Sequence, residues 1–186
     1  MITNTINVQK EYLEFIKNLK RKISMYDLKS EFTQIIFLCV GTNKIIGDMI
    51  GPMVGEDLKN RINKNTKKEI IVFGNMENTL NLKNAKNIIS NIKSKYVNPF
   101  IITIDTALGK EENLKKIYVT QGEIEIGKAV SKGIKYESHV NIKGVVGKYS
   151  NTKEKNINTL KNVEPESIFY LSSIISNGIT EVIKNI

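Results

Sequence analysis

The sequence predicts an α/β fold with three layers, in which helices cover both faces of a mostly parallel sheet. Three apolar runs of strand length support this prediction, at residues 35–40, 70–73 and 100–104. Unbroken runs of this kind are typical of parallel strands that are buried on both faces. A helical pattern follows each of the first two runs, so strand and helix alternate as βαβ units require. We expect residues 1–186 to form one domain.

The first strand and the helix after it are the stretch around which the rest of the chain is organised. Gly41 ends the strand, and a loop with Gly47 and Asp48 follows it. Pro52 then fits the first turn of a helix, where a missing N–H costs least. Apolar residues recur every four positions in this helix, at Ile50, Val54, Leu58 and Ile62. Asp48 therefore lies beyond the carboxyl end of a strand, which is where open α/β sheets bind their ligands.

A second aspartate follows the third strand. The second strand leads into a helix over residues 82–96, for which Asn81 is the expected N-cap. The third strand then runs to Ile104, and Asp105 stands directly after it. If the first and third strands are neighbours in a parallel sheet, the carboxylates of Asp48 and Asp105 face one crevice.

The remaining chain adds peripheral elements. The N-terminal extension, residues 1–30, contains a helix with apolar residues at a spacing of three to four. We expect this helix to pack on the sheet or on a partner chain, and contact with a membrane surface is the third alternative. The other expected elements are a strand at 117–119, a loop or hairpin at 122–133, a strand that begins near 140 and ends at 144–147, an exposed loop or short helix at 148–163 and a C-terminal helix at 165–186.

The chain carries a formal net charge of +9, from 28 lysines and arginines against 19 acidic residues. Only Arg21 and Arg61 are arginines, although arginine is favoured for bidentate contacts with phosphates and bases. The lysines are scattered among asparagines and isoleucines, as in a chain from an A/T-rich genome. We therefore ascribe the charge to composition and expect no nucleic-acid partner. The alternative, a nucleic-acid surface, predicts DNA affinity that falls steeply with salt.

Membrane and secretory functions are not expected either. No apolar run approaches the roughly 18 residues of a membrane helix, and the N-terminus lacks the apolar region of a signal peptide. Cys39 is the single cysteine and lies in the predicted buried strand, so we expect a core residue rather than a catalytic thiol. These observations predict a cytoplasmic protein without an internal disulfide.

Three titratable residues carry the chemistry that this chain offers: Asp48, Asp105 and His139, the single histidine. Two neighbouring carboxylates cannot both ionise without cost, so such a pair can act as a base toward water and as an acid toward a leaving group. Together with a histidine, the pair could instead bind a divalent transition metal such as nickel or zinc. Structural roles are the alternatives: a helix cap for Asp48, an anchor for the next loop for Asp105, and a core or surface position for His139.

Other functional classes lack their motifs. The loop from Gly41 to Gly47 has neither the G-x-G-x-x-G spacing nor the G-K-[ST] sequence of nucleotide-binding loops. The G-x-S-x-G nucleophile elbow does not occur. One cysteine and one histidine are too few for a structural zinc site. The paired aspartates therefore remain as the candidate site.

Two motifs resemble those of a known family. They are G-T-N-K-x-x-G-D-x-x-G-P, from Gly41 to Pro52, and N-P-F-I-I-T-I-D-T-A-L-G, from Asn98 to Gly109. Both look like the corresponding blocks of YyaC-type sporulation proteins, which are often described as spore proteases, and the resemblance covers residues 34–147. That family is similar in fold to the hydrogenase maturation endopeptidases and to the germination protease that degrades small acid-soluble spore proteins.

The resemblance implies a site as well as a fold. In both relatives an acidic residue after the first strand and an aspartate after the third lie in the active site, and Asp48 and Asp105 match these positions. The hydrogenase-processing enzymes add a histidine that completes a nickel-recognising set, and His139 is the candidate for that role. The other motif residues expected to shape the loop or to contact substrate are Gly41, Thr42, Asn43, Gly47 and Gly109.

Two functions follow from these observations. The first is a sporulation-associated endopeptidase that uses Asp48 and Asp105 to hydrolyse a bond in a peptide or protein substrate, such as a spore protein, in the cytoplasm of a forespore or mother cell. The second is a metal- or peptide-binding sporulation factor of the same fold without turnover, with nickel or zinc as the metals to consider. An oligomer is compatible with either function.

Overall fold

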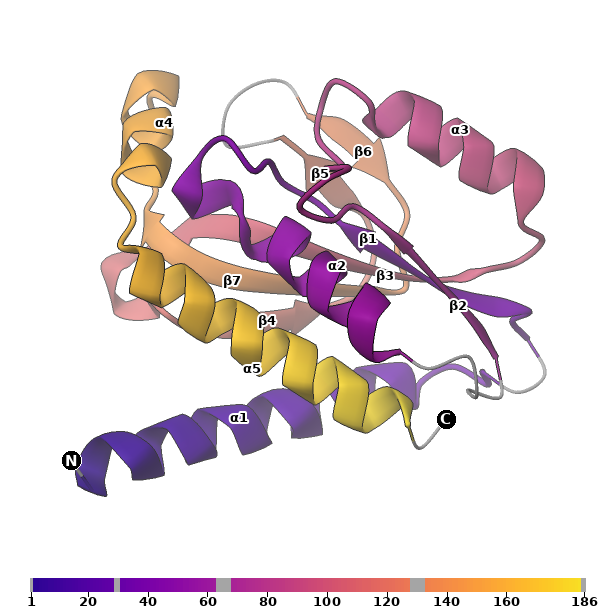
Figure 1. Ribbon diagram of the computed structural model, residues 1–186, viewed down its shortest axis with the longest axis horizontal. Coiled ribbons are helices and arrows are strands. Elements are labelled where there is room, and N and C mark those ends of the chain that lie inside the picture. Colours follow the sequence, from indigo (N-terminus) through magenta and orange to yellow (C-terminus); the bar gives the residue numbers. More distant parts are fainter. Residues whose placement is uncertain (1, 29–30, 63–67, 128–132, 185–186) are drawn as a thin grey trace.

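A five-stranded sheet with the strand order β2-β1-β3-β7-β4 forms the centre of the fold (Figure 1). The computed structural model describes residues 2–28, 31–62, 68–127 and 133–184, and their side chains from residue 9 onward. Four strands run parallel, and β4 at one edge pairs antiparallel with β7. A separate antiparallel pair consists of β5 and β6. The strands are β1 (Gln34–Cys39), β2 (Glu69–Phe73), β3 (Phe100–Gly109), β4 (Ile117–Thr120), β5 (Ile124–Ile126), β6 (Ile134–Tyr136) and β7 (Val140–Lys148).

Helices lie on both faces of the sheet. One face is covered by α1 (Ile2–Ile23), α2 (Ile50–Arg61) and α5 (Pro165–Ile183), and the other by α3 (Ala85–Lys95) together with the β5–β6 pair (Figure 1). Each face has its own cluster of buried apolar residues. The predicted three-layer α/β fold is therefore confirmed.

The alternation of side chains along β1 explains why its sequence is apolar without interruption. Phe37 and Cys39 point into the cluster under α2 and α5, whereas Ile36 and Leu38 point into the cluster under α3. All six residues of the strand are buried, as expected for a parallel strand between two layers. Cys39 is a core residue, as predicted, and its burial raises the pKa of the thiol.

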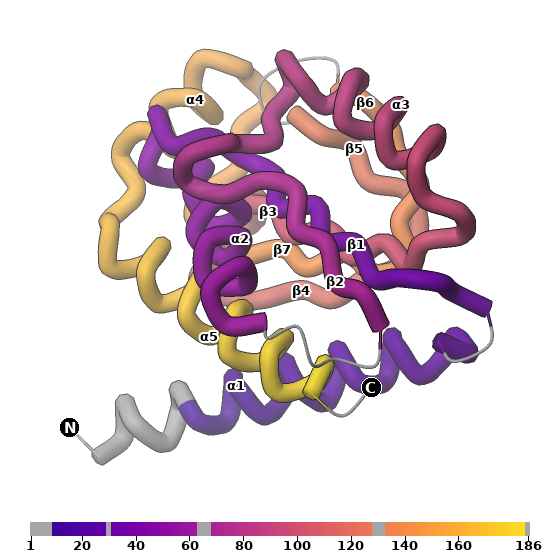
Figure 2. The backbone as a smooth tube through the Cα atoms, turned by 45° about the vertical axis from the view of Figure 1, so that its right-hand side comes forward, coloured from indigo at the N-terminus to yellow at the C-terminus, as the bar shows by residue number. Residues whose placement is uncertain are grey.

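The N-terminal helix packs on the body of the protein. Figure 2 shows α1 beside α5, below the sheet. Its apolar stripe is buried in the same cluster as α5, through Phe15, Ile16, Leu19 and Ile23. Of the alternatives for this helix, packing on the sheet layer is therefore the one that the structure shows. No helix among the described residues is long and apolar enough to cross a membrane.

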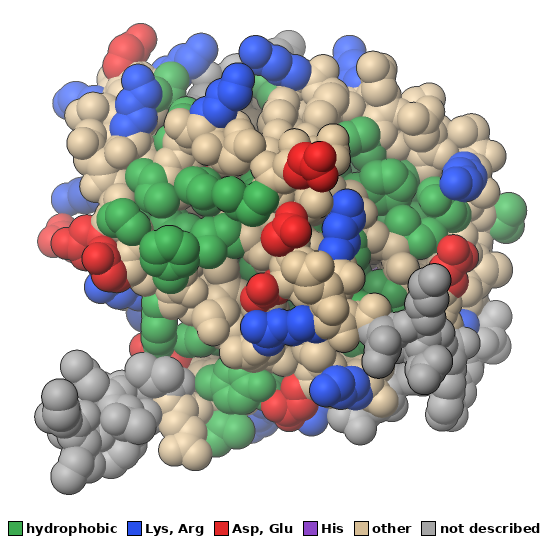
Figure 3. Space-filling view, viewed as in Figure 1, with side chains coloured by type: hydrophobic (Ala, Val, Ile, Leu, Met, Phe, Trp, Pro, Cys, Tyr) green, Lys and Arg blue, Asp and Glu red, His purple; other side chains and the backbone are tan. Residues whose placement is uncertain are grey.

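A short helix, α4 (Lys153–Lys161), packs against the 3-10 helix η1 (Ile46–Asp48) beyond the carboxyl ends of the strands. On the face shown in Figure 3, hydrophobic side chains gather where α4, α5 and η1 meet, while Lys and Arg side chains are dispersed among acidic and neutral ones. Phe169 of α5 is 57% exposed. The predicted exposed loop or short helix at 148–163 thus contains a helix that covers one end of the sheet.

Two predicted boundaries need correction. The third strand does not end before Asp105, because β7 continues to pair with β3 as far as Gly109. The helix predicted over residues 82–96 begins only at Ala85, after a turn over residues 82–84. Asn81 caps this turn: its Oδ1 accepts a hydrogen bond from the Lys83 N–H at 3.0 Å, and its main-chain oxygen accepts one from the Ala85 N–H at 2.9 Å. Of the predicted loop or hairpin at 122–133, residues 128–132 lie outside the described part of the chain.

Candidate active site

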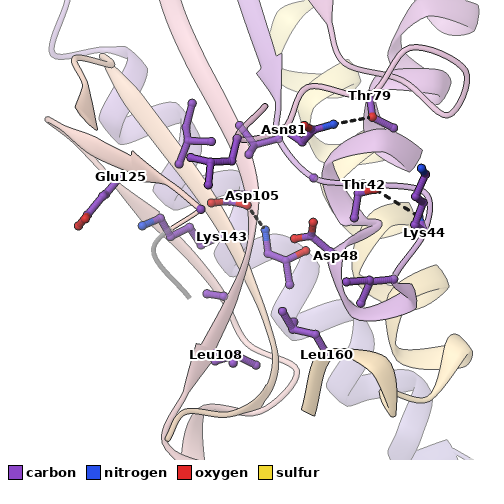
Figure 4. Close-up of a pocket in the computed structure, with 18 of the residues that line it drawn as sticks. Thr42, Lys44, Asp48, Thr79, Asn81, Asp105, Leu108, Glu125, Lys143 and Leu160 are labelled. Atoms are coloured by element: carbon purple, nitrogen blue, oxygen red, sulfur yellow. Dashed lines mark hydrogen bonds between the residues drawn. The ribbon is translucent and has the colours of Figure 1, made fainter. Parts of the chain in front are cut away.

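A cavity of about 640 Å³ lies at the carboxyl ends of β1 and β3 (Figure 4). These two strands are neighbours, and the helices that follow and precede them, α2 and α3, cover opposite faces of the sheet. The order in which strands are added to the sheet thus reverses between β1 and β3, and doubly wound sheets bind ligands at such a point. The lining comes from the loop after β1, the loop before α3, the strands β3, β5 and β7, and α4.

Asp48 is held at the cavity by a tightly folded loop. The Thr42 N–H donates to the main-chain oxygen of Asp48 at 3.0 Å. Gly41 has a φ of +147°, and a β-carbon there would stand 2.1 Å from the same oxygen. Only glycine permits this approach without strain. The first glycine of the motif therefore brings the end of β1 and the aspartate together.

The next glycines of the motif set the spacing between elements. A β-carbon on Gly51 would stand 2.0 Å from the main-chain oxygen of Val40, so this glycine lets α2 start close to the end of β1. A β-carbon on Gly47 would stand 2.5 Å from the main-chain oxygen of Leu160 in α4. Gly47 therefore acts by letting α4 approach η1, and it does not line the cavity.

Asp105 lies within β3 and points toward the α3 side of the sheet, because it alternates with the core residue Ile104 on the opposite side. Its Oδ1 accepts a hydrogen bond from the Thr106 N–H at 2.8 Å. On the neighbouring strand β7, Lys143 stands in the same register. Figure 4 shows the carboxyl groups of Asp48 and Asp105 in the middle of the cavity.

Burial raises the pKa of both aspartates. The pKa of Asp48 is raised to about 7 by loss of hydration, which the nearby Thr42 amide offsets only in part. The pKa of Asp105 is raised to about 8, first by loss of hydration and then by the negative charge of Asp48, with Lys143 acting in the opposite direction. Because the charge of Asp48 disfavours ionisation of Asp105, the two carboxyl groups titrate as a coupled pair.

The structure divides the predicted motif residues into two groups. Gly41 and Thr42 line the cavity together with the two aspartates. Asn43 lies outside it and donates from its side-chain amide to the Met76 main-chain oxygen at 2.9 Å. Gly109 ends β3 and packs near the Val145 side chain, so neither Gly109 nor Asn43 is placed to contact a ligand in the cavity.

His139 lies away from the aspartates, which corrects the prediction that it joins them. It directly precedes β7 and therefore lies at the amino end of the sheet, whereas Asp105 lies toward the carboxyl end of β3. Its Nδ1 accepts a hydrogen bond from the Ile101 N–H at 2.9 Å, and its ring stacks on Phe100 at a centroid distance of 4.8 Å. Burial lowers the pKa of His139 and favours the neutral ring. Its contacts are those of a structural residue: a stacked ring and a hydrogen-bond acceptor for the backbone.

We expect a His139→Phe substitution to destabilise the fold more at pH 8 than at pH 5. Phenylalanine keeps the ring but leaves the Ile101 N–H without its acceptor, at a cost of about 1–3 kcal/mol. Because folding lowers the pKa of the histidine, wild type has this stabilisation above about pH 6.5 and loses it as the pH falls. Urea unfolding of both proteins at the two pH values gives the two differences in free energy. Equal differences would contradict this role for the histidine.

The cavity does not present the ligands that nickel or zinc prefer. Its carboxyl groups come from Asp48, Asp105 and Glu125, Lys143 is also part of the wall, and its described lining includes neither histidine nor cysteine. Within the described ranges, no group of three or more His, Cys, Asp or Glu side chains is placed to hold a metal ion. A resident metal therefore does not fit this site, and the chemistry below is derived from the carboxyl groups alone.

Several lining residues were not predicted to belong to the site: Lys143, Leu108, Leu160 and Tyr149. Lys143 could have been found, because it lies on the polar side of the alternating pattern of β7, the same side that Asp105 takes in β3. Leu108 lies in the second motif, but the predicted strand ended before it. Leu160 and Tyr149 lie in a lysine-rich segment whose sequence does not indicate that it folds over the strand ends.

The fold defines the class of protein to which this chain is similar. Its structure matches the crystal structure of a [NiFe] hydrogenase maturation protease, HycI from Thermococcus kodakarensis KOD1, with a TM-score of 0.55. The match covers 86% of this chain and 97% of the other, at 20% sequence identity. At this identity the likeness establishes the fold, which is the fold that the two motifs implied.

The chain belongs to the family described as "Protein of unknown function (DUF1256)", which matches residues 3–178. It is also 24% identical over 164 residues to "Uncharacterized protein YyaC" of Bacillus subtilis (strain 168). That alignment covers 88% of this chain and 77% of the relative. The resemblance to YyaC-type proteins is therefore confirmed.

Proposed function

We propose that this protein is an endopeptidase in which Asp48 and Asp105 together hydrolyse a peptide bond. The observation that supports the proposal is the pair itself: two carboxyl groups from different elements share one cavity, and their pKa values are raised to about 7 and about 8. Environments that shift the pKa values of neighbouring carboxyl groups toward neutrality are typical of catalytic sites. The fold shared with a hydrogenase maturation protease is consistent with this reaction.

The reaction needs one proton on the pair. The ionised carboxylate accepts a proton from water as the water oxygen attacks the carbonyl carbon of the peptide. The protonated carboxyl group gives its proton to the leaving nitrogen as the C–N bond breaks. One water molecule is consumed, a carboxylic acid and an amine are formed, and the pair again holds one proton, now on the other carboxyl group.

The biological setting is a further part of the proposal. We place the activity in sporulation, acting on a peptide or a spore protein in the cytoplasm of a spore-forming cell. Its support is the similarity to YyaC, a Bacillus subtilis protein, together with the resemblance of the two motifs to spore proteases. The same fold without turnover, as a peptide-binding factor, is the outcome that an inactive but folded wild type would favour.

Cleavage should have a bell-shaped dependence on pH, with its maximum between about 7 and about 8. Below this range both aspartates are protonated and the base is lost, and above it both are ionised and the acid is lost. A mixed peptide library, with products read by mass spectrometry, gives the initial rates from pH 5 to pH 10, with and without a chelator. A rate that keeps rising up to pH 10, or one that a chelator abolishes, would contradict a carboxyl pair acting alone.

A further inference from the structure

We propose that Leu108 and Leu160 form a subsite that takes a large aliphatic side chain next to the scissile peptide bond. This inference rests on the proposed function, because the aspartates define where that bond lies. It adds the class of residue that the protein selects at one position of its substrate.

Two leucines form one side of the cavity beside the aspartates. In Figure 4, Leu108 and Leu160 lie together on one side of Asp48 and Asp105. The other labelled residues of the wall are polar and lie on the remaining sides: Thr42, Lys44, Thr79, Asn81, Glu125 and Lys143. On this side, a substrate that spans the aspartates meets two leucine side chains. Further apolar residues belong to the wall: Val40, Ile45, Leu82, Ala107 and Ile126.

The apolar side is built as a fixed part of the fold. Leu108 belongs to β3, and Leu160 belongs to α4 and is only 4% exposed. The close contact of Gly47 with the Leu160 backbone ties α4 to η1, which carries Asp48. Within α4, the Asn156 side chain accepts a hydrogen bond from the Ser150 N–H at 2.8 Å. The Gly47 contact links the subsite wall to the element that carries Asp48, which favours a defined shape.

An aliphatic side chain is the occupant that this chemistry recognises. The leucine side chains offer dispersion contacts and removal of apolar surface from water, which favour Leu, Ile or Met. A charged or amide side chain placed there would lose its hydration and find no polar wall in return. Because hydrophobic pockets discriminate by about 10–200-fold for small differences in size, we expect a preference of about 10–100-fold for Leu over Ala in kcat/KM.

The test changes the size of the subsite and reads the specificity. A peptide library varied at the positions on both sides of the cleaved bond is digested by wild type, Leu108→Phe and Leu108→Ala. The phenylalanine variant should shift the preference at one position toward Ala or Val, and the alanine variant should shift it toward Phe, each by about tenfold. Leu114→Phe makes the same change at a leucine that is 38% exposed outside the cavity and should leave the preference as it is.

A binding measurement separates failure of the subsite from failure of the proposed function. The full wild-type chain is titrated with N-acetyl-leucine methylamide and with the asparagine analogue, and the leucine methyl groups are followed by NMR. Shifts of the Leu108 and Leu160 methyls with the leucine probe alone support the subsite even if no peptide is cleaved, in which case only the peptidase proposal fails. Cleavage without an aliphatic preference, or methyl shifts that are equal for both probes, would overturn the inference.

Discussion

Replacing Asp105 with asparagine should abolish peptide cleavage while the protein stays folded. The amide cannot take a proton from water or give one to the leaving nitrogen, and general acid–base catalysis contributes about 10²–10⁴-fold, so we expect kcat/KM to fall by about 1,000-fold or more. Folding should persist because the asparagine oxygen can still accept the 2.8 Å hydrogen bond from the Thr106 N–H. Asp48→Asn should have the same effect, and the double variant should be no worse than either, because the two groups act as a unit.

A matched control tests whether the loss of cleavage is specific to the aspartates of the cavity. Glu77→Gln makes the same carboxyl-to-amide change at an exposed position near the cavity but outside its lining. It should cleave at the wild-type rate. Undiminished cleavage by Asp105→Asn, measured on the same library and with product termini assigned, would remove the aspartate pair from the mechanism.

Asp105→Asn should also change how the free energy of unfolding depends on pH, and this effect can be measured without an activity assay. Because folding raises the pKa of Asp105 from 3.8 to about 8, the folded protein holds a proton that the unfolded chain releases. Wild-type stability therefore falls as the pH rises through this window, and asparagine removes that loss. We expect Asp105→Asn to gain stability relative to wild type between pH 5 and pH 9, on the order of a few kcal/mol. Urea unfolding at both pH values measures it, and a difference that does not change with pH would show that the carboxyl group titrates normally.

The elements that could be predicted from the sequence are those whose buried apolar residues recur at a regular spacing. The six buried residues of β1 and the four-residue spacing in α2 predicted both elements closely, because a single periodicity describes each of them. Asp105 could be placed beside Asp48 for a different reason, since the carboxyl-terminal parts of neighbouring parallel strands lie at the same edge of a sheet. The end of β3 was missed because it depends on pairing with β7, which no local pattern reveals.

The position of His139 relative to its strand could have shown that it lies far from the aspartates. His139 precedes its strand, whereas Asp105 belongs to the carboxyl half of β3. In a parallel sheet the amino and carboxyl ends of the strands lie at opposite edges, so this order alone separates the histidine from the aspartates. Leu160 is a different case: it reaches the cavity through contacts of α4 with η1, and such long-range packing leaves no periodic trace in the sequence.

Replacing Gly55 with alanine should destabilise the protein strongly, against the trend of helix propensity. Gly55 lies inside α2, where alanine is normally favoured over glycine by about 1 kcal/mol. Here a β-carbon would stand 1.9 Å from the main-chain oxygen of Gly74 and 3.0 Å from the Cys39 β-carbon. Because the first contact is with backbone, α2 must move away from the sheet, at a cost of about 3 kcal/mol or more. We expect the Tm to fall by roughly 6–12 °C.

A second alanine substitution in α2 serves as the control for Gly55→Ala. Asn60→Ala introduces alanine at an exposed position of α2, and propensity alone should raise stability there by a few tenths of a kcal/mol. Opposite signs for the two alanines would show that the glycine is required for the approach of α2 to β1 and β2. Since η1 and Asp48 immediately precede α2, residual folded Gly55→Ala should also cleave more slowly. An unchanged Tm would mean that the helix does not pack as closely as the structure shows.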